Sequence, residues 1–127
     1  MTACLLSLAL CLADPVGRPS VTTFVAYAAD ANHTPPTVAG GRLLAEMDRI
    51  AGVATRRALY RSPVRDAVTV AANGVRFHRP ARVKDLLVVS GVVTAVGEKS
   101  LTVRTTVERE TDAGLELLVE GEFRSEE

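Results

Sequence analysis

The sequence predicts an α+β fold in which one long central helix is wrapped by a curved antiparallel sheet. Two observations lead to this prediction. Residues 41–59 have the spacing of an amphipathic helix, and stretches rich in β-branched residues precede and follow them. The length of 127 residues is enough for one domain with a single core, so one kind of functional site is expected.

The predicted helix has one apolar face, formed by Leu43, Leu44, Met47, Ile50, Ala51, Ala54 and Ala58. Arg42, Arg49 and Arg56 recur at a constant interval and are expected on the opposite face, towards solvent. Pro63 prevents the helix from continuing, because proline lacks the backbone N–H and clashes with the preceding turn.

The stretches expected to form strands are residues 21–28, 66–77, 85–96, 100–109 and 115–123. The segment between the first strand and the helix contains prolines and a glycine pair, so it is expected to be a loop. Residues 86–96 are apolar on both faces, which is typical of an interior strand. A single helix covers only one face of such a sheet. Burial of the other face and pairing of exposed strand edges favour a homodimer or higher oligomer.

Composition excludes several classes of partner. Fifteen basic residues balance fifteen acidic ones, and aromatic residues are scarce, so binding to nucleic acid is not expected. The two cysteines, Cys4 and Cys11, lie close together near the start of the chain and offer no metal-ligand cluster. Neither a metal site nor a cofactor is therefore predicted.

The first residues form an apolar run that resembles the central region of a signal peptide but is too short to span a bilayer. No basic residue precedes Arg18, which favours an N-terminal helix packed on the domain, or a misassigned start, over a signal peptide. We expect residues 1–20 to be an N-terminal extension and residues 21–127 to form the domain. The expected location is cytoplasmic, with a secreted or organellar location as the alternative.

Asp48 is the strongest candidate for a catalytic residue. It lies at the edge of the apolar face of the predicted helix, where partial desolvation raises the basicity of a carboxylate and suits it to act as a general base. The same pattern also fits a surface aspartate that pairs with Arg49 or Arg56.

The Gly40-Gly41 pair leads directly into the helix, where backbone N–H groups of the first turn lack intrahelical partners. Glycine lets a carbonyl oxygen approach these donors closely, so the pair is a candidate oxyanion hole. The glycines also fit a purely structural role in the turn. Asn32 and His33 lie upstream in the same loop; Asn32 can orient water or polarise a carbonyl, and His33 can act as an acid or a base.

Five elements of the sequence resemble a known family when taken in order. They are DAN at residues 30–32, TVAGG at 37–41, MDRIAG at 47–52, VRFHRPARVKDLL at 75–87 and VGEKS at 96–100. In order and spacing they are similar to the acyl-CoA thioesterases of the hotdog superfamily. The chain departs from the family pattern at Ala39, where Phe or His is usual, and at Lys84, where the family has glycine before Asp85.

The resemblance implies a hotdog fold, a dimer with a continuous sheet, and active sites between subunits that hydrolyse acyl-CoA to the free acid and coenzyme A. Asp48 matches the general base or nucleophile, Asn32 the residue that orients water and thioester, and Gly40 and Gly41 the oxyanion hole. Lys99 and Ser100 match the segment near the nucleotide of coenzyme A. Phe77 and Arg57 are further candidates for substrate contact.

Two alternatives stay open at this point. A hotdog dehydratase or hydratase would use His33 as the base, because His33 and the glycine pair partly resemble the elements of that enzyme. A non-catalytic acyl-CoA binding subunit would keep the fold and lose turnover.

Overall fold

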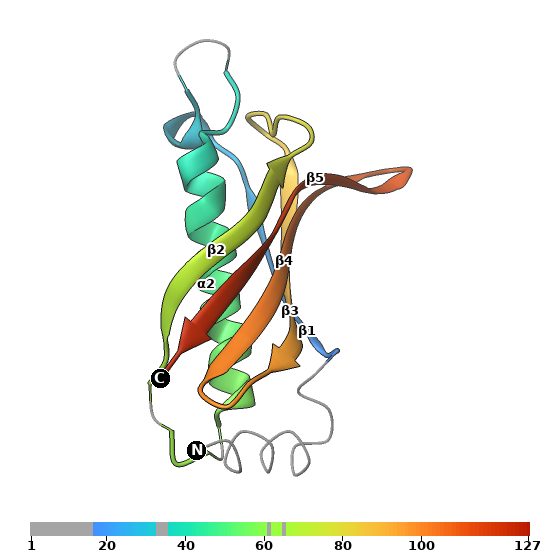
Figure 1. Cartoon of the computed structure of the whole chain (residues 1–127). Helices are drawn as coiled ribbons and strands as arrows, with labels where there is room; N and C mark the ends of the chain where they lie inside the picture. Colours follow the sequence, from blue (N-terminus) through green and yellow to red (C-terminus); the bar gives the residue numbers. More distant parts are fainter. Residues whose placement is uncertain (1–16, 33–35, 61, 65) are drawn as a thin grey trace.

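The computed structural model describes residues 17–32, 36–60, 62–64 and 66–127. Its elements are β1 (Pro19–Val25), the 3-10 helix η1 (Ala28–Asp30), α2 (Gly40–Ala58), β2 (Val68–Phe77), β3 (Leu86–Val96), β4 (Ser100–Thr111) and β5 (Gly114–Glu126). The strands form one antiparallel sheet in the order β1-β3-β4-β5-β2, and α2 lies along one of its faces (Figure 1). The predicted arrangement of one long helix against an antiparallel sheet is confirmed.

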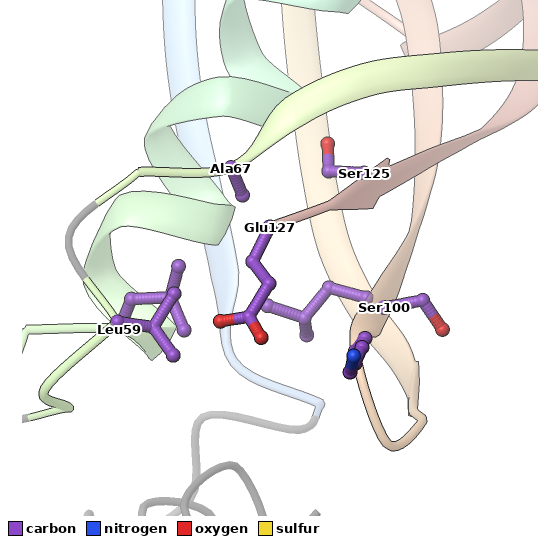
Figure 2. A pocket seen from close by; sticks show the side chains of 8 residues that line it. Leu59, Ala67, Ser100, Ser125 and Glu127 are labelled. Atoms are coloured by element: carbon purple, nitrogen blue, oxygen red, sulfur yellow. The ribbon is translucent and has the colours of Figure 1, made fainter. Parts of the chain in front are cut away.

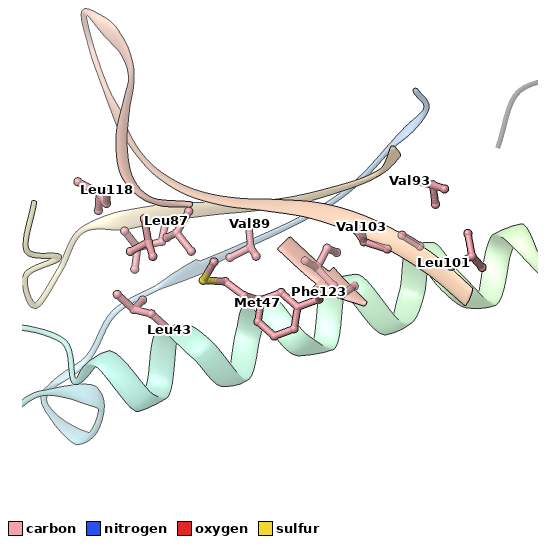
Figure 3. Close-up of a cluster of buried hydrophobic side chains, with 14 of the residues drawn as sticks. Leu43, Met47, Leu87, Val89, Val93, Leu101, Val103, Leu118 and Phe123 are labelled. Carbon is pink, nitrogen blue, oxygen red and sulfur yellow. The ribbon is translucent and has the colours of Figure 1, made fainter. Parts of the chain in front are cut away.

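The core lies between α2 and the concave face of the sheet. The helix buries Leu43, Met47, Ile50, Ala51, Ala54, Thr55 and Ala58. Figure 3 shows the sheet curving over the helix, with Leu43 and Met47 pointing towards the side chains of Leu87, Val89 and Phe123. The apolar face that helical periodicity predicted is therefore the face that contacts the sheet.

Strand β4 has one buried and one accessible face. Leu101, Val103, Thr105 and Val107 point into the core, whereas Arg104 is exposed. Arg104 donates a hydrogen bond to Glu120 of neighbouring β5 at 2.6 Å, so charged side chains pair across the outer face of the sheet. Buried and accessible side chains thus alternate along β4, as in an antiparallel sheet with one face towards the core.

Gly91 allows the helix to approach the sheet closely. A Cβ atom at this position in β3 would lie 3.2 Å from the carbonyl oxygen of Ile50 and 3.3 Å from the Cγ1 atom of Val103. Both distances are shorter than ordinary van der Waals contact, so a larger residue would force the helix or the sheet to shift.

Lys84 adopts a backbone conformation that usually favours glycine. Its φ angle is 75°, and its N–H donates a hydrogen bond to the carbonyl oxygen of Ala26 at 2.7 Å. The adjacent turn is closed by the N–H of Arg82, which donates to the Asp85 carboxylate at 2.8 Å. Lys84 thus adopts at this turn a left-handed backbone conformation that glycine adopts more readily.

We expect Leu87→Ala to lower the free energy of unfolding by about 2–5 kcal/mol, because Leu87 is fully buried and its removal leaves a cavity in the core. Urea denaturation followed by circular dichroism measures this change. The matched control is Leu115→Ala near the β4–β5 turn, where the side chain is 54% exposed and the change should stay within about 0.5 kcal/mol. Equal effects of the two substitutions would contradict the placement of the core.

Candidate functional site

Asp48 lies on the face of α2 that borders β2. Its Oδ1 atom accepts a hydrogen bond of 2.7 Å from the hydroxyl of Thr69, the second residue of β2. In the described part of the chain the partner of this carboxylate is therefore a strand hydroxyl and not an arginine of its own helix. Among the described residues Asp48 is exposed, so the expectation of a partly desolvated carboxylate is wrong for this part of the chain.

A bulge in β2 lies next to Thr69. Val68 and Thr69 pair with Glu126 and Ser125 of β5, but the register shifts between Thr69 and Ala71. Bulges bend a strand and redirect neighbouring side chains, and they often occur beside functional sites. The irregular start of β2 thus helps to place the Thr69 hydroxyl against the helix.

Gly40 and Gly41 form the beginning of α2, and Ala39 caps the helix with an extended backbone. The first amides that bond within this end of the helix belong to Arg42 and Leu43, which donate to the carbonyl of Ala39 at 3.0 and 3.3 Å. A Cβ atom at Gly41 would meet nothing within 4 Å. The backbone in front of Gly41 is therefore accessible to a ligand oxygen, as an oxyanion hole requires.

The loop that carries Asn32 is held against the start of the helix by short antiparallel pairings. The N–H of Ala39 donates to the carbonyl of Asp30 at 2.9 Å, and the N–H of Asn32 donates to the carbonyl of Thr37 at 2.8 Å. Asn32 is exposed, and the structure brings it to the same end of α2 as the glycine pair.

An ion-pair cluster connects this loop to the first turn of the helix. Arg42 contacts Asp30 at 2.9 Å and Glu46 at 2.6 Å. The backbone N–H of Tyr27 and the Arg42 guanidinium hold the pKa of the Asp30 carboxyl below its usual value. Arg42 was predicted on the solvent face of the helix, but it is only partly exposed, because η1 folds over this turn.

Phe77 lies at the same end of the molecule. Its ring is 3.5 Å from the position that a Cβ atom at Gly40 would occupy, so the absence of a side chain at Gly40 makes room for the ring. Phe77 is nevertheless 51% exposed, which leaves much of its ring free to contact a ligand.

The remaining candidates lie at the opposite end of α2. Arg57 donates a hydrogen bond to the Ser20 hydroxyl at 3.2 Å. Lys99 and Ser100 line a small, shallow cleft together with Leu59, Val64, Ala67, Leu101, Ser125 and Glu127 (Figure 2). This cleft lies beside the C-terminal end of the helix, away from Gly40 and Gly41.

The single chain does not bring all of the predicted residues together. Asp48 follows Gly40 by eight residues, which corresponds to about 12 Å along a helix axis. A general base and an oxyanion hole must both reach one carbonyl group within hydrogen-bond distance. One chain therefore cannot place both on the same substrate.

Thr69 was missed by the sequence analysis, because it is separated from Asp48 by a loop and its contact depends on the pairing of β2. His33 lies outside the described residues. The described residues contain no group of three or more His, Cys, Asp or Glu side chains arranged to bind a metal ion. Among them there is also no helix long and apolar enough to cross a membrane.

A family model described as the thioesterase superfamily matches residues 36–116. No curated protein matches the chain.

Solved structures with the same architecture include the acyl-CoA hydrolase of Staphylococcus aureus in complex with butyryl coenzyme A, coenzyme A and coenzyme A disulfide. It has a TM-score of 0.78 and 21% identity, over 85% of this chain and 64% of that chain. The chain thus spans slightly less than two thirds of the length of this enzyme. An apo-hexameric acyl-CoA thioesterase has a TM-score of 0.75 and 27% identity, over 85% and 67% of the two chains. A hexameric hotdog fold thioesterase of Campylobacter jejuni has a TM-score of 0.70 and 24% identity, over 83% and 79%. The expected hotdog fold is confirmed.

Proposed function

Because the chain belongs to the thioesterase superfamily, we propose that it hydrolyses acyl-coenzyme A to the free acid and coenzyme A. The observation that carries this proposal is the carboxylate of Asp48, which is exposed on α2 and held by the Thr69 hydroxyl at 2.7 Å. A carboxylate that is fixed and accessible can reach water or a thioester carbonyl, whereas a buried ion pair cannot. Similar structures that are named as acyl-CoA hydrolases and thioesterases support the choice of substrate.

In the proposed reaction Asp48 removes a proton from water, and the resulting hydroxide adds to the thioester carbonyl carbon. The negative charge that develops on the carbonyl oxygen is stabilised by the N–H groups of Gly40 and Gly41. Asn32 orients the water or the thioester. The C–S bond then breaks, and the thiolate of coenzyme A takes up the proton from Asp48.

Direct attack by Asp48 on the carbonyl is the other route, with an acyl anhydride that water hydrolyses afterwards. A single turnover in oxygen-labelled water separates the two routes. Attack by water puts the label only in the released acid, whereas hydrolysis of an anhydride can leave the label in the Asp48 carboxylate.

We propose that the active site is completed by a second copy of the chain. The distance of about 12 Å along α2 means that Asp48 and the glycine pair of one chain serve different substrates. Strand β2 ends the sheet and exposes Val68 and Val70, at 64% and 50%, close to Thr69. Pairing of two such edges would join the sheets of two chains and bury these side chains. The hexameric relatives support an assembly of this kind.

The substrate-binding roles of Phe77, Arg57, Lys99 and Ser100 remain predictions. Phe77 lies beside Gly40, where it can contact the group next to the thioester. Lys99 and Ser100 lie at the other end of the helix. We therefore propose that they bind the nucleotide of the substrate, while the glycine pair of another protomer binds the carbonyl oxygen of the same substrate.

Release of free thiol from a panel of short, long and aromatic acyl-CoA esters tests the proposed function. We expect turnover of at least one ester, and the chain-length profile would define the acyl pocket. Saturable binding of these esters without any thiol release would instead support a non-catalytic acyl-CoA binding protein. Hydration of an enoyl-CoA would support the dehydratase alternative.

We expect Thr69→Val to lower kcat by about tenfold or more with little change in KM, because loss of a hydrogen bond to a charged group leaves Asp48 less well oriented. Steady-state kinetics on the best ester measures this effect. The control is Thr106→Val on the outer face of the sheet, which should retain the parent kcat. An unchanged kcat in Thr69→Val would show that this hydrogen bond has no part in turnover.

A further inference from the structure

The side chains of Asp30, Arg42 and Glu46 form a partly enclosed cluster of charges beside the N-terminus of α2. The three side chains are 17%, 33% and 13% exposed, whereas Arg104 in the surface pair with Glu120 is 52% exposed. The Arg42 guanidinium also lies over the Phe24 ring, 4.7 Å from its centroid. Three side chains, those of Asp30, Glu46 and Phe24, therefore restrict the orientation of the Arg42 guanidinium.

Asp30 uses all of its polar groups to connect these parts. Its Oδ1 atom accepts from Arg42, its Oδ2 atom accepts from the backbone N–H of Tyr27, and its backbone carbonyl accepts from the N–H of Ala39. Asp30 therefore forms hydrogen bonds to three parts of the structure: the η1 turn, the residue that caps α2, and the first turn of α2.

These contacts join the two halves of the proposed oxyanion region. Asn32 lies two residues after Asp30, whereas Gly40 and Gly41 immediately precede Arg42. Glu46, one turn further along α2, holds the other side of the guanidinium. A shift of the Asp30 segment would thus move Asn32 relative to the N–H groups of the glycine pair.

We propose that Asp30 and Arg42 are positioning residues that fix the amide of Asn32 relative to the oxyanion-binding N–H groups of Gly40 and Gly41. The proposal rests on the thioesterase function proposed above. Catalysis depends steeply on such placement, and an error of about 1 Å can cost on the order of a hundredfold in rate. Neither residue needs to touch the substrate.

A double-mutant cycle in the full chain tests this role. The variants are Arg42→Gln, Asn32→Ala and their combination, assayed for kcat and KM on the best acyl-CoA ester. We expect Arg42→Gln to lower kcat by about ten- to a hundredfold with KM nearly unchanged. We also expect Asn32→Ala to cost much less in the Arg42→Gln background than in the parent, because Asn32 is already misplaced there.

Asp30→Asn is the second variant, because it removes the charge that pairs with Arg42 while an amide oxygen can still accept from Tyr27. It should show the same non-additivity with Asn32→Ala even if Arg42→Gln does not fold. The control is Arg104→Gln, which breaks a surface ion pair with Glu120 and should leave kcat and its response to Asn32→Ala unchanged.

Additive effects on kcat, or an unchanged kcat in both Asp30→Asn and Arg42→Gln, would overturn the positioning role while leaving the proposed function intact. A loss of kcat that also appears in Arg104→Gln would equally overturn it. A parent protein that releases no thiol from any ester would overturn the proposed function itself, and the positioning role with it.

Discussion

Replacement of Asp48 by asparagine is expected to lower kcat/KM for acyl-CoA hydrolysis by about a hundred- to ten-thousandfold, the usual contribution of a general base. Asparagine has nearly the same shape, and its amide oxygen can still accept the hydrogen bond from Thr69, so the geometry of the contact between α2 and β2 is retained. The substitution therefore removes the basic carboxylate and little else. Thiol release under kcat/KM conditions measures the loss, and thermal unfolding verifies that the variant is folded.

Asp112→Asn provides a matched control for this experiment. Asp112 is an exposed aspartate in the turn between β4 and β5, far along the chain from the helix. The same chemical change there should leave hydrolysis within a factor of about two, because surface substitutions away from a site rarely have large effects. If Asp48→Asn kept the parent kcat/KM, Asp48 would be neither the base nor the nucleophile.

Mixing two strongly impaired variants, Asp48→Asn and Asn32→Ala, is expected to restore activity. In the proposed assembly each site combines Asp48 of one protomer with Asn32 and the glycine pair of another. A dimer formed from one Asp48→Asn chain and one Asn32→Ala chain then contains one site with both mutations and one site with none. Random pairing at equal amounts should give about a quarter of the parent activity, because half of the dimers are mixed and half of their sites are intact.

Co-expression of the two variants with different affinity tags, followed by purification through both tags, isolates the mixed dimers for this measurement. Their activity should approach about half of the parent value, with one intact site of two. A mixed dimer as inactive as either variant alone would place Asp48 and Asn32 of the same chain in one site. That outcome would conflict with the separation of about 12 Å between Asp48 and the N-terminus of α2, where Asn32 lies, so it would also imply a rearrangement of this end of the helix in solution.

The helix and the segments that form strands could be predicted because they follow from side-chain periodicity and composition. The helix predicted at residues 41–59 is observed at Gly40–Ala58, since its apolar residues must all face the sheet. The last strand was predicted to end at residue 123 but continues to Glu126. Apolar residues stop at Phe123, whereas backbone pairing with β4 does not, and Ser125 remains buried against the core.

The contacts of the candidate site were less predictable, because they depend on tertiary structure. The bond between Thr69 and Asp48 requires a bulge in β2 that no local pattern indicates. Helical spacing alone placed Arg42 with the solvent-facing arginines, but η1 covers it and supplies Asp30 as a partner. In the proposed assembly a second chain would cover Asp48, and side-chain periodicity within one sequence does not place such a chain.

The contact at Gly91 has a consequence for how the protein can evolve. The carbonyl of Ile50 lies opposite Gly91, and Ile50 follows Asp48 closely on α2. The distance between α2 and the sheet at Gly91 therefore also affects the distance between the Asp48 carboxylate and β2. A side chain at position 91 would require the helix or the sheet to move by a few tenths of an ångström, and a movement of the helix would change the contact between Asp48 and Thr69. Selection for turnover would then act on Gly91, which is buried and does not contact the substrate in the proposed site. Smaller side chains at Ile50 and Val103 would have to make room before a larger residue could replace Gly91.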